Sequence, residues 1–233
     1  MCNKWPILMS DSGRDRLAAV FAEAREQHRT VLLPYLTAAI PSAEDSVMLF
    51  KAMADAGADG FEVGIPYADP LMDGPVIMQA GEQALKAGVT VSVALDVVRR
   101  VVEETGKPVL AMTYVNPVLR RGIDTFFSEV AATGAVGVII ADLPADEAGP
   151  FVEAAAEVGV GLVLFVAPTT DDDRLKTVFD ADPAFIYAVA EIGVTGERDA
   201  ASTNTEQLAE RIREHSDVDT RRQEANGQGQ PHA

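Results

Sequence analysis

The chain is poor in the residues that build disulfide frameworks and metal sites. It contains one cysteine, Cys2, and three histidines among 233 residues. A single thiol can form no internal disulfide. His215 and His232 lie in or beside a polar C-terminal segment, away from any apolar pattern. The composition therefore excludes a disulfide scaffold and argues against a cysteine or histidine metal site.

Positive charge and long apolar runs are also scarce. The 19 Lys and Arg residues are outnumbered by 36 Asp and Glu, which gives a formal net charge of -17. A surface of this sign repels a phosphate backbone, so nucleic acid is not expected as a partner. The longest apolar stretches, at residues 134–141 and 158–168, are interrupted by glycine and too short to cross a bilayer. No basic segment with an apolar run opens the chain, and we expect a cytoplasmic protein without a membrane partner.

The chain does contain a recurring unit in which an amphipathic segment ends at glycine and a β-branched apolar run follows. The unit occurs at residues 57–63, 134–140 and 159–166. Glycine just past a helix end readily adopts the left-handed conformation that caps helices. Near-continuous apolar strands are typical of parallel sheets that are covered on both faces. The pattern predicts βα repeats around a parallel sheet.

Six such units favour an α/β fold of the (βα)8 TIM-barrel family, with an incomplete barrel of about six βα units, over a doubly wound sheet, because no G-x-G-x-x-G follows the first strand. We expect a barrel domain at residues 1–215 and a polar, disordered tail at 216–233. The expected strands are residues 31–36, 60–63, 108–114, 137–141, 161–166 and 185–189. The expected helices are residues 14–27, 42–56, 75–87, 91–104, 123–133, 146–158, 171–179 and 204–214.

Polar side chains gather where the expected strands end, which is where TIM barrels carry their chemistry. The loop at residues 193–196 has two glycines flanking a hydroxyl, a composition suited to anion binding or to a mobile lid. The other polar residues at strand ends are Thr37, Glu62, Asp73, Tyr114, Asn116, Asp142 and Tyr187.

Two of these residues are candidates for acid–base catalysis. Glu62 lies inside an apolar strand, and alternation places it on the face opposite Phe61 and Val63. A buried carboxyl is costly and is kept mainly where chemistry or a tight partner needs it. A salt-bridged strand-end acid remains an alternative for Glu62, and a turn-forming residue for Asp73. The presence of both favours a catalytic pair.

Residues 61–75, FEVGIPYADPLMDGP, resemble the signature of the tryptophan synthase α subunit. The resemblance continues through YVNP at 114–117, ADLP at 141–144 and IGVTG at 192–196, and it covers roughly residues 14–215. It implies a lyase of L-tryptophan biosynthesis that cleaves indole-3-glycerol phosphate to indole and glyceraldehyde 3-phosphate without a cofactor. It also implies a partner, the pyridoxal-phosphate β subunit of a heterotetramer, which receives the indole.

The resemblance assigns roles to individual residues. It implies that Glu62 transfers protons near indole C3 and that Asp73 holds the ring N–H, and the reaction needs one such group at each place. Tyr187, although an aromatic in a strand is often only core, matches a residue that lines the substrate pocket. The remaining substrate-binding residues implied are Tyr114, Met112, Thr195 and Gly196.

The chain also departs from the family pattern. Ala39-Ile40-Pro41 replaces a usual acidic turn, Met78 stands where glutamine is usual, and Glu191 would lie near a phosphate ester. Residues 216–233 cannot supply strands seven and eight, whose loops commonly build the phosphate site. Three explanations stay open: a truncated or frame-altered gene, a fragment completed by another chain, and a self-associating reduced barrel.

Two functional alternatives follow. A catalytically weak α-like protein would still bind and stimulate a β subunit through the loops after the second and sixth strands. Another phosphosugar barrel, such as an isomerase, is disfavoured because the expected strands carry neither a lysine nor a strand-end histidine.

Overall fold

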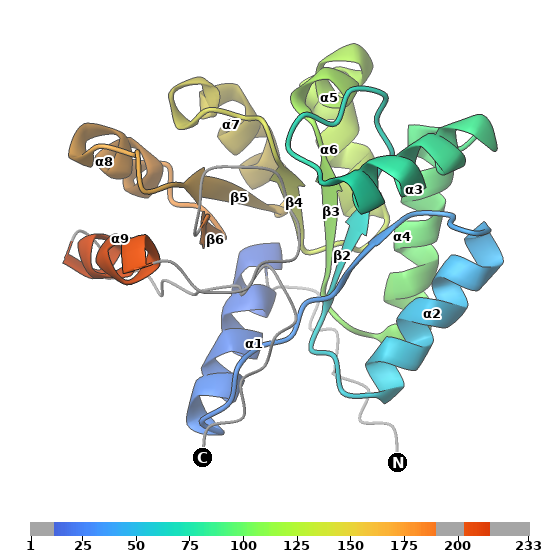
Figure 1. The fold of residues 1–233 in the computed structure, drawn as a ribbon, viewed down its shortest axis with the longest axis horizontal. Coiled ribbons are helices and arrows are strands. Elements are labelled where there is room, and N and C mark those ends of the chain that lie inside the picture. The colour runs from blue at the N-terminus through green and yellow to red at the C-terminus, as the bar shows by residue number, and fades with distance from the viewer. Residues whose placement is uncertain (1–11, 190–202, 215–233) are drawn as a thin grey trace.

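The computed structural model describes residues 12–189 and 203–214 (Figure 1). These residues form one six-stranded sheet in the order β1-β2-β3-β4-β5-β6, and every neighbouring pair is parallel. The strands are β1 (Tyr35–Thr37), β2 (Phe61–Gly64), β3 (Val109–Thr113), β4 (Gly137–Ile140), β5 (Gly161–Val166) and β6 (Phe185–Ala188). The helices are α1 (Gly13–Glu26), α2 (Ala43–Asp55), α3 (Pro75–Lys86), α4 (Val91–Thr105), α5 (Val115–Arg121), α6 (Ile123–Ala132), the 3-10 turn η1 (Ala145–Glu147), α7 (Gly149–Glu157), α8 (Asp172–Asp180) and α9 (Thr203–Glu214).

The helices cover the outer face of the curved sheet. Figure 1 shows them fanned around the strands from α2 to α8, with α1 apart from this fan. Their apolar faces and the outward side chains of the strands form the larger core. In it, the rings of Phe50 on α2 and Phe61 on β2 meet edge to face at 5.1 Å. Burial on both faces explains why these strands read as almost continuous apolar runs.

A second, smaller core lies on the inner face of the sheet. It joins Leu17 and Phe21 of α1 to inward side chains of four strands, Leu110, Ile139, Val163 and Phe185. The helix approaches the segments that precede β4 and β5, and the Gly13 N–H donates to the Gly159 carbonyl at 2.7 Å. A Cβ atom on Gly13 would lie 1.9 Å from the Val136 carbonyl oxygen, so this contact requires glycine. Helix α1 therefore closes the amino-terminal end of the barrel and leaves the carboxyl end for the site.

Helix α9 packs beside β6 and α8. Its Leu208 and Ile212 are buried in the larger core, and Arg211 donates to the Thr170 carbonyl at 2.8 Å and to Asp172 at 2.7 Å. Within the described residues, β1 and β6 are the outer strands of the sheet. No helix in this part of the chain is both long and apolar enough to pass through a bilayer. The expected tail at 216–233 lies outside the described residues.

All six expected strands are present, but the first is shorter than predicted and begins at Tyr35. Leu32 accepts a hydrogen bond from the N–H of Asp59, just before β2, and Pro34 accepts one from the N–H of Glu62, within β2, at 3.0 Å each. Pro34 has no N–H to return, so the ladder is interrupted there. The helix expected from residue 146 begins at Gly149, because Pro150 fits the first turn of a helix and η1 precedes it.

A short helix, α5, was not predicted from the sequence, and Asn116 lies on it rather than in a loop. The main-chain N–H of Val115, in the first turn of α5, donates to the Asp142 carboxylate at 2.7 Å. The carboxylate that satisfies this free N–H thus comes from the loop after β4, far along the chain. A local pattern could not show this contact.

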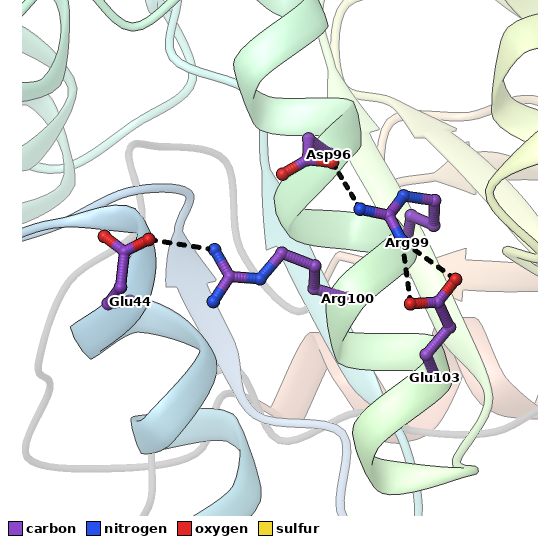
Figure 2. Close-up of polar contacts among 5 residues, drawn as sticks. All are labelled: Glu44, Asp96, Arg99, Arg100 and Glu103. Atoms are coloured by element: carbon purple, nitrogen blue, oxygen red, sulfur yellow. Dashed lines mark hydrogen bonds and ion pairs between the residues drawn. The ribbon is translucent and has the colours of Figure 1, made fainter.

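On the outer surface, α2 and α4 are joined by ion pairs. Figure 2 shows Glu44 of α2 reaching Arg100 of α4 at 3.2 Å, while Arg99 binds Asp96 and Glu103 within its own helix. A hollow of about 460 Å³ lies between α2 and α4. It is on the far side of the sheet from the inward-facing polar residues, and it is not part of the candidate site.

Candidate active site at the carboxyl end of the sheet

Glu62 lies on the inner face of β2. Its neighbours Phe61 and Val63 point into the larger core, between the sheet and the helices, and alternation turns Glu62 to the opposite side. In the sheet register it is the partner of Tyr35 on β1 and of Leu110 on β3, whose side chain belongs to the inner core. Only 5% of Glu62 is exposed. The predicted burial and facing of this carboxyl are therefore present in the structure.

Asp73 lies in the loop between β2 and α3 and is 7% exposed. Burial raises the pKa of its carboxyl, and a hydrogen bond with the Tyr114 hydroxyl acts in the opposite direction. Burial is the larger of the two effects, because the ionised carboxylate loses its hydration. Asp73 is thus a carboxyl whose proton is held more tightly than usual, in contact with one phenol.

Tyr114 ties this loop to the end of β3. It stands just before α5 and is 3% exposed, and its hydroxyl accepts the main-chain N–H of Met72 at 3.2 Å. Its ring lies 5.2 Å from that of Tyr67, whose hydroxyl accepts a hydrogen bond from Asn116 at 2.8 Å. Two aromatic side chains and an amide therefore fix the loop that carries Asp73.

Tyr35 was not predicted as a site residue, yet it is the register partner of Glu62 on the inner face of the sheet. Burial, together with the negative charges of Asp73 and Glu62, raises the pKa of Tyr35 to about 12. Its hydroxyl lies 3.3 Å from the Thr37 hydroxyl. The signal that could have found it is its position two residues before Thr37, on the same face of the first strand. The negative charges of Glu62 and Asp73 thus both act on one phenol.

Apolar and aromatic side chains share this inner face of the sheet. Met112 on β3 and Tyr187 on β6 pack at the rim of the inner core, and the rings of Phe165 and Tyr187 stack at 5.0 Å with an interplanar angle of 30°. Burial and the charge of Glu62 raise the pKa of Tyr187. A phenol that stays neutral beside stacked aromatic rings suits a flat, uncharged ring as ligand.

The structure thus brings together five of the residues expected at the site: Glu62, Asp73, Met112, Tyr114 and Tyr187. The other two, Thr195 and Gly196, lie outside the described residues, as does Glu191. Asp142 does not join the carboxyl pair, since it binds the N–H of Val115. Among residues 12–189 and 203–214, no three His, Cys, Asp or Glu side chains are grouped as metal ligands would be.

Comparisons with known proteins agree with this geometry. The sequence profile of the family described as tryptophan synthase alpha chain matches residues 21–221. The chain is 42% identical over 207 residues to the tryptophan synthase alpha chain of Nocardia farcinica, covering 89% of this chain and 77% of that one. It is 40% identical over 202 residues to the one from Streptomyces avermitilis, covering 87% of this chain and 73% of that one.

Solved structures give the same result. A structure of Mycobacterium tuberculosis tryptophan synthase superposes with a TM-score of 0.81 at 39% identity and covers 87% of this chain and 77% of that chain. The tryptophan synthase subunit alpha of Legionella pneumophila gives a TM-score of 0.71 at 32% identity, over 75% of this chain and 67% of that one.

Sequence profile, relatives and fold therefore point to one family. The expected TIM-barrel class with six βα units is confirmed by the parallel sheet and by these neighbours. The expected relationship is confirmed by the profile match over most of the chain. The chain belongs to the tryptophan synthase alpha chain family and has its lyase function, the cleavage of indole-3-glycerol phosphate.

Proposed function

We propose that the cleavage of indole-3-glycerol phosphate in this chain is carried out by Glu62 and Asp73. The observation that carries the proposal is that both carboxyls are buried on β2 and in the loop after it, and that the charges of both act on the same phenol, Tyr35. Met112, Tyr114 and Tyr187 supply the surfaces that would contact the indole ring. Thr195 and Gly196 belong to the proposal through the family motif alone.

The reaction is a retro-aldol cleavage, and it needs protons at two atoms. The carboxylic acid form of Glu62 gives a proton to indole C3, and positive charge then develops at the ring nitrogen. The ionised Asp73 accepts the hydrogen bond of the ring N–H and stabilises that charge. The resulting Glu62 carboxylate next removes the proton of the adjacent carbinol hydroxyl. The C3–carbon bond breaks, its electron pair restores the indole, and the hydroxyl carbon becomes the aldehyde of glyceraldehyde 3-phosphate.

This sequence of steps is balanced without a further reactant. The proton delivered to C3 remains on the product indole, and the proton taken from the hydroxyl restores the acid form of Glu62. The roles also match the environments. A carboxyl enclosed by apolar strands exchanges protons with the substrate rather than with water.

We also propose a pyridoxal-phosphate β subunit as partner, in a cytoplasmic heterotetramer. Next to Asp73, one short segment of the chain exposes several large apolar side chains, and such exposure is uncommon on the surface of a globular protein. They are Leu71, Met72, Val76 and Met78, exposed to 72%, 42%, 81% and 40%. A partner seated on this loop and the start of α3 would lie within a few residues of the Asp73 carboxyl.

The test is an assay of indole release from indole-3-glycerol phosphate, with and without β subunit. Glu62→Gln keeps the shape of the side chain but cannot exchange a proton, and we expect a loss of about 10²-fold to 10⁴-fold. Asp73→Asn should lose activity in the same range. Glu157→Gln, at an exposed position on α7, is the matched control and should retain it.

Full activity in the Glu62→Gln variant would contradict the assigned proton transfer. A wild-type chain that released no indole, but accelerated the β reaction, would leave only the stimulating role.

A further inference from the structure

Asp142 is a polar residue at a strand end to which the mechanism above gives no role. It follows β4 and is exposed, and its carboxylate accepts the main-chain N–H of Val115 at 2.7 Å. The residue before it, Ala141, donates its own N–H to the carbonyl of Thr113, the last residue of β3, at 3.0 Å. Two consecutive residues after β4 are therefore bound to the chain around the end of β3.

Helix α5 depends on this bond because its own N-cap residue does not cap it. The N-cap position is taken by Tyr114, whose side chain makes no capping hydrogen bond. A helix start is more often capped by a Ser, Thr, Asp or Asn side chain at the N-cap itself. Here Asp142 accepts the first-turn N–H from another loop, and a carboxylate is favoured at the positive end of a helix. The side chain of Tyr114 is thereby available for contacts elsewhere.

Those contacts are with the loop that carries Asp73. The Tyr114 hydroxyl accepts the N–H of Met72, the residue directly before Asp73, at 3.2 Å. The N–H of Asp73 donates to the Pro70 carbonyl at 3.1 Å, so Met72 and Asp73 belong to one turn. The buried Tyr114 ring also packs 5.2 Å from that of Tyr67, in the same loop. A shift of the Tyr114 main chain would therefore move the turn that carries Asp73.

We propose that Asp142 is a positioning residue for the cleavage, which holds the first peptide of α5 and, through Tyr114, the turn that carries Asp73. The Val115 N–H belongs to the planar peptide that is attached to the Cα of Tyr114, so the bond from Asp142 sets the orientation of that plane. Asp142 acts through these neighbours and not on the substrate. The inference rests on the proposed role of Asp73.

The test compares Asp142→Ala with Asp142→Asn in the assay of indole release. Alanine removes the acceptor, and kcat/KM should fall by about tenfold, because a misplacement of about 1 Å at a catalytic group can cost about 10²-fold. Asparagine keeps an acceptor oxygen and caps helices as well as aspartate does, so Asp142→Asn should stay within about twofold of wild type.

The pH profile of kcat/KM separates a shift of Tyr114 from the mere loss of a negative charge. If Tyr114 moves, its hydrogen bond to the ionised Asp73 weakens, and the acid limb moves to higher pH. Loss of a neighbouring negative charge by itself would favour the ionised form of Asp73 and move the limb to lower pH. We expect a move to higher pH in Asp142→Ala and no move in Asp142→Asn.

Two further measurements test the path through Tyr114. In Tyr114→Phe, which lacks the hydroxyl, adding Asp142→Ala should lower kcat/KM by less than about twofold, because effects that pass through one residue are not additive. Amide hydrogen exchange at Met72, followed by NMR, should be faster in Asp142→Ala than in wild type, and this measurement needs no turnover. Exchange at Ala38, whose N–H donates to the Gly64 carbonyl at 2.8 Å, should not change.

Asp171→Ala is the matched control. Asp171 is the N-cap of α8 and accepts the N–H of Arg174 at 2.9 Å, so its loss removes a carboxylate cap of the same kind. The melting temperature should fall about as much as in Asp142→Ala. The value of kcat/KM, the acid limb and the exchange at Met72 should all stay as in wild type.

An Asp142→Ala variant with the kcat/KM and acid limb of wild type would overturn the proposal, as would an Asp142→Asn variant as impaired as Asp142→Ala. An undiminished further loss in the Tyr114→Phe background, or unchanged exchange at Met72, would also overturn it. Failure of the proposed function looks different, since it would appear as full indole release in Asp73→Asn while the effect of Asp142→Ala on Met72 exchange remained.

Discussion

The Tyr114 hydroxyl hydrogen-bonds the Asp73 carboxylate while it accepts the main-chain N–H of Met72 at 3.2 Å. One phenol from the end of β3 therefore holds both the backbone and the carboxyl of the loop after β2. The hydrogen bond lowers the pKa of Asp73 against the larger opposing effect of burial. Tyr114 thereby helps to keep Asp73 ionised for its proposed contact with the ring N–H.

Replacing Tyr114 by Phe should raise the pKa of Asp73, because the bond that favours its ionised form is lost. The acid limb of the pH profile of kcat/KM should move to higher pH. We also expect a loss of stability of about 1 kcal/mol, since the Met72 N–H loses its acceptor. Tyr67→Phe is the matched control: its hydroxyl accepts from Asn116, and the pH profile should stay in place. If the acid limb did not move in Tyr114→Phe, the hydrogen bond from Tyr114 would not be what lowers the pKa of Asp73.

Asp73→Asn should make the chain more resistant to unfolding at neutral pH. Because the folded-state pKa of Asp73 is raised, the folded chain holds this proton more tightly than the unfolded chain. Its contribution to stability is full below the unfolded-state pKa and is lost as pH rises through the folded-state pKa. Urea unfolding at about pH 4 and about pH 7 should therefore show a greater gain for the variant at the higher pH. Asp69→Asn, an exposed acid in the same loop, should show no such difference.

Gly64→Ala should disturb Tyr35. The new methyl group would meet the phenol at 2.1 Å, far inside contact distance, so the ring must leave its place on β2. We expect a loss of about 1–3 kcal/mol in unfolding free energy, together with slower indole release. Gly149→Ala is the control, since nothing lies within 4 Å of its Cβ position. A Gly64→Ala variant as stable and active as Gly149→Ala would show that the phenol is not packed as described.

The ion pair between α2 and α4 in Figure 2 should contribute little. The Glu44 side chain is 74% exposed and that of Arg100 25%, so water and salt screen the attraction across 3.2 Å. A double-mutant cycle of Glu44→Ala and Arg100→Ala should give a coupling below about 1 kcal/mol, smaller still at high salt. Indole release should not change. A coupling above about 2 kcal/mol would mean that the pair is far better shielded than its exposure indicates.

Much of the architecture could be predicted because it follows from short-range patterns of apolar residues and glycine in the sequence. The fifth strand begins and ends as predicted, at Gly161 and Val166, since glycine marks its start and apolar residues continue on both faces. The alternation around Glu62 predicts its side of the sheet in the same way.

Contacts between distant segments were not predictable in this way. Helix α5 has a first-turn N–H bound by Asp142, from a different loop, and the sequence around Val115 contains no sign of that acceptor. The length of the first strand was overestimated because Val31 and Leu33 have side chains typical of strands. The hydrogen-bond ladder, however, is interrupted at Pro34, which accepts a bond from β2 but has no N–H to donate.

The order of residues alone was enough for the βα repeat, the inward face of each strand and the family, because each depends on side-chain type at fixed local spacing. Curvature of the sheet, which brings the charges of Glu62 and Asp73 to act on Tyr35, depends on how all the strands pack with the helices outside them. The distance from a phenol on one strand to a carboxyl in the next loop is a product of that packing. The sequence could therefore name two carboxyls, while the phenol on which both charges act emerged only from the folded chain.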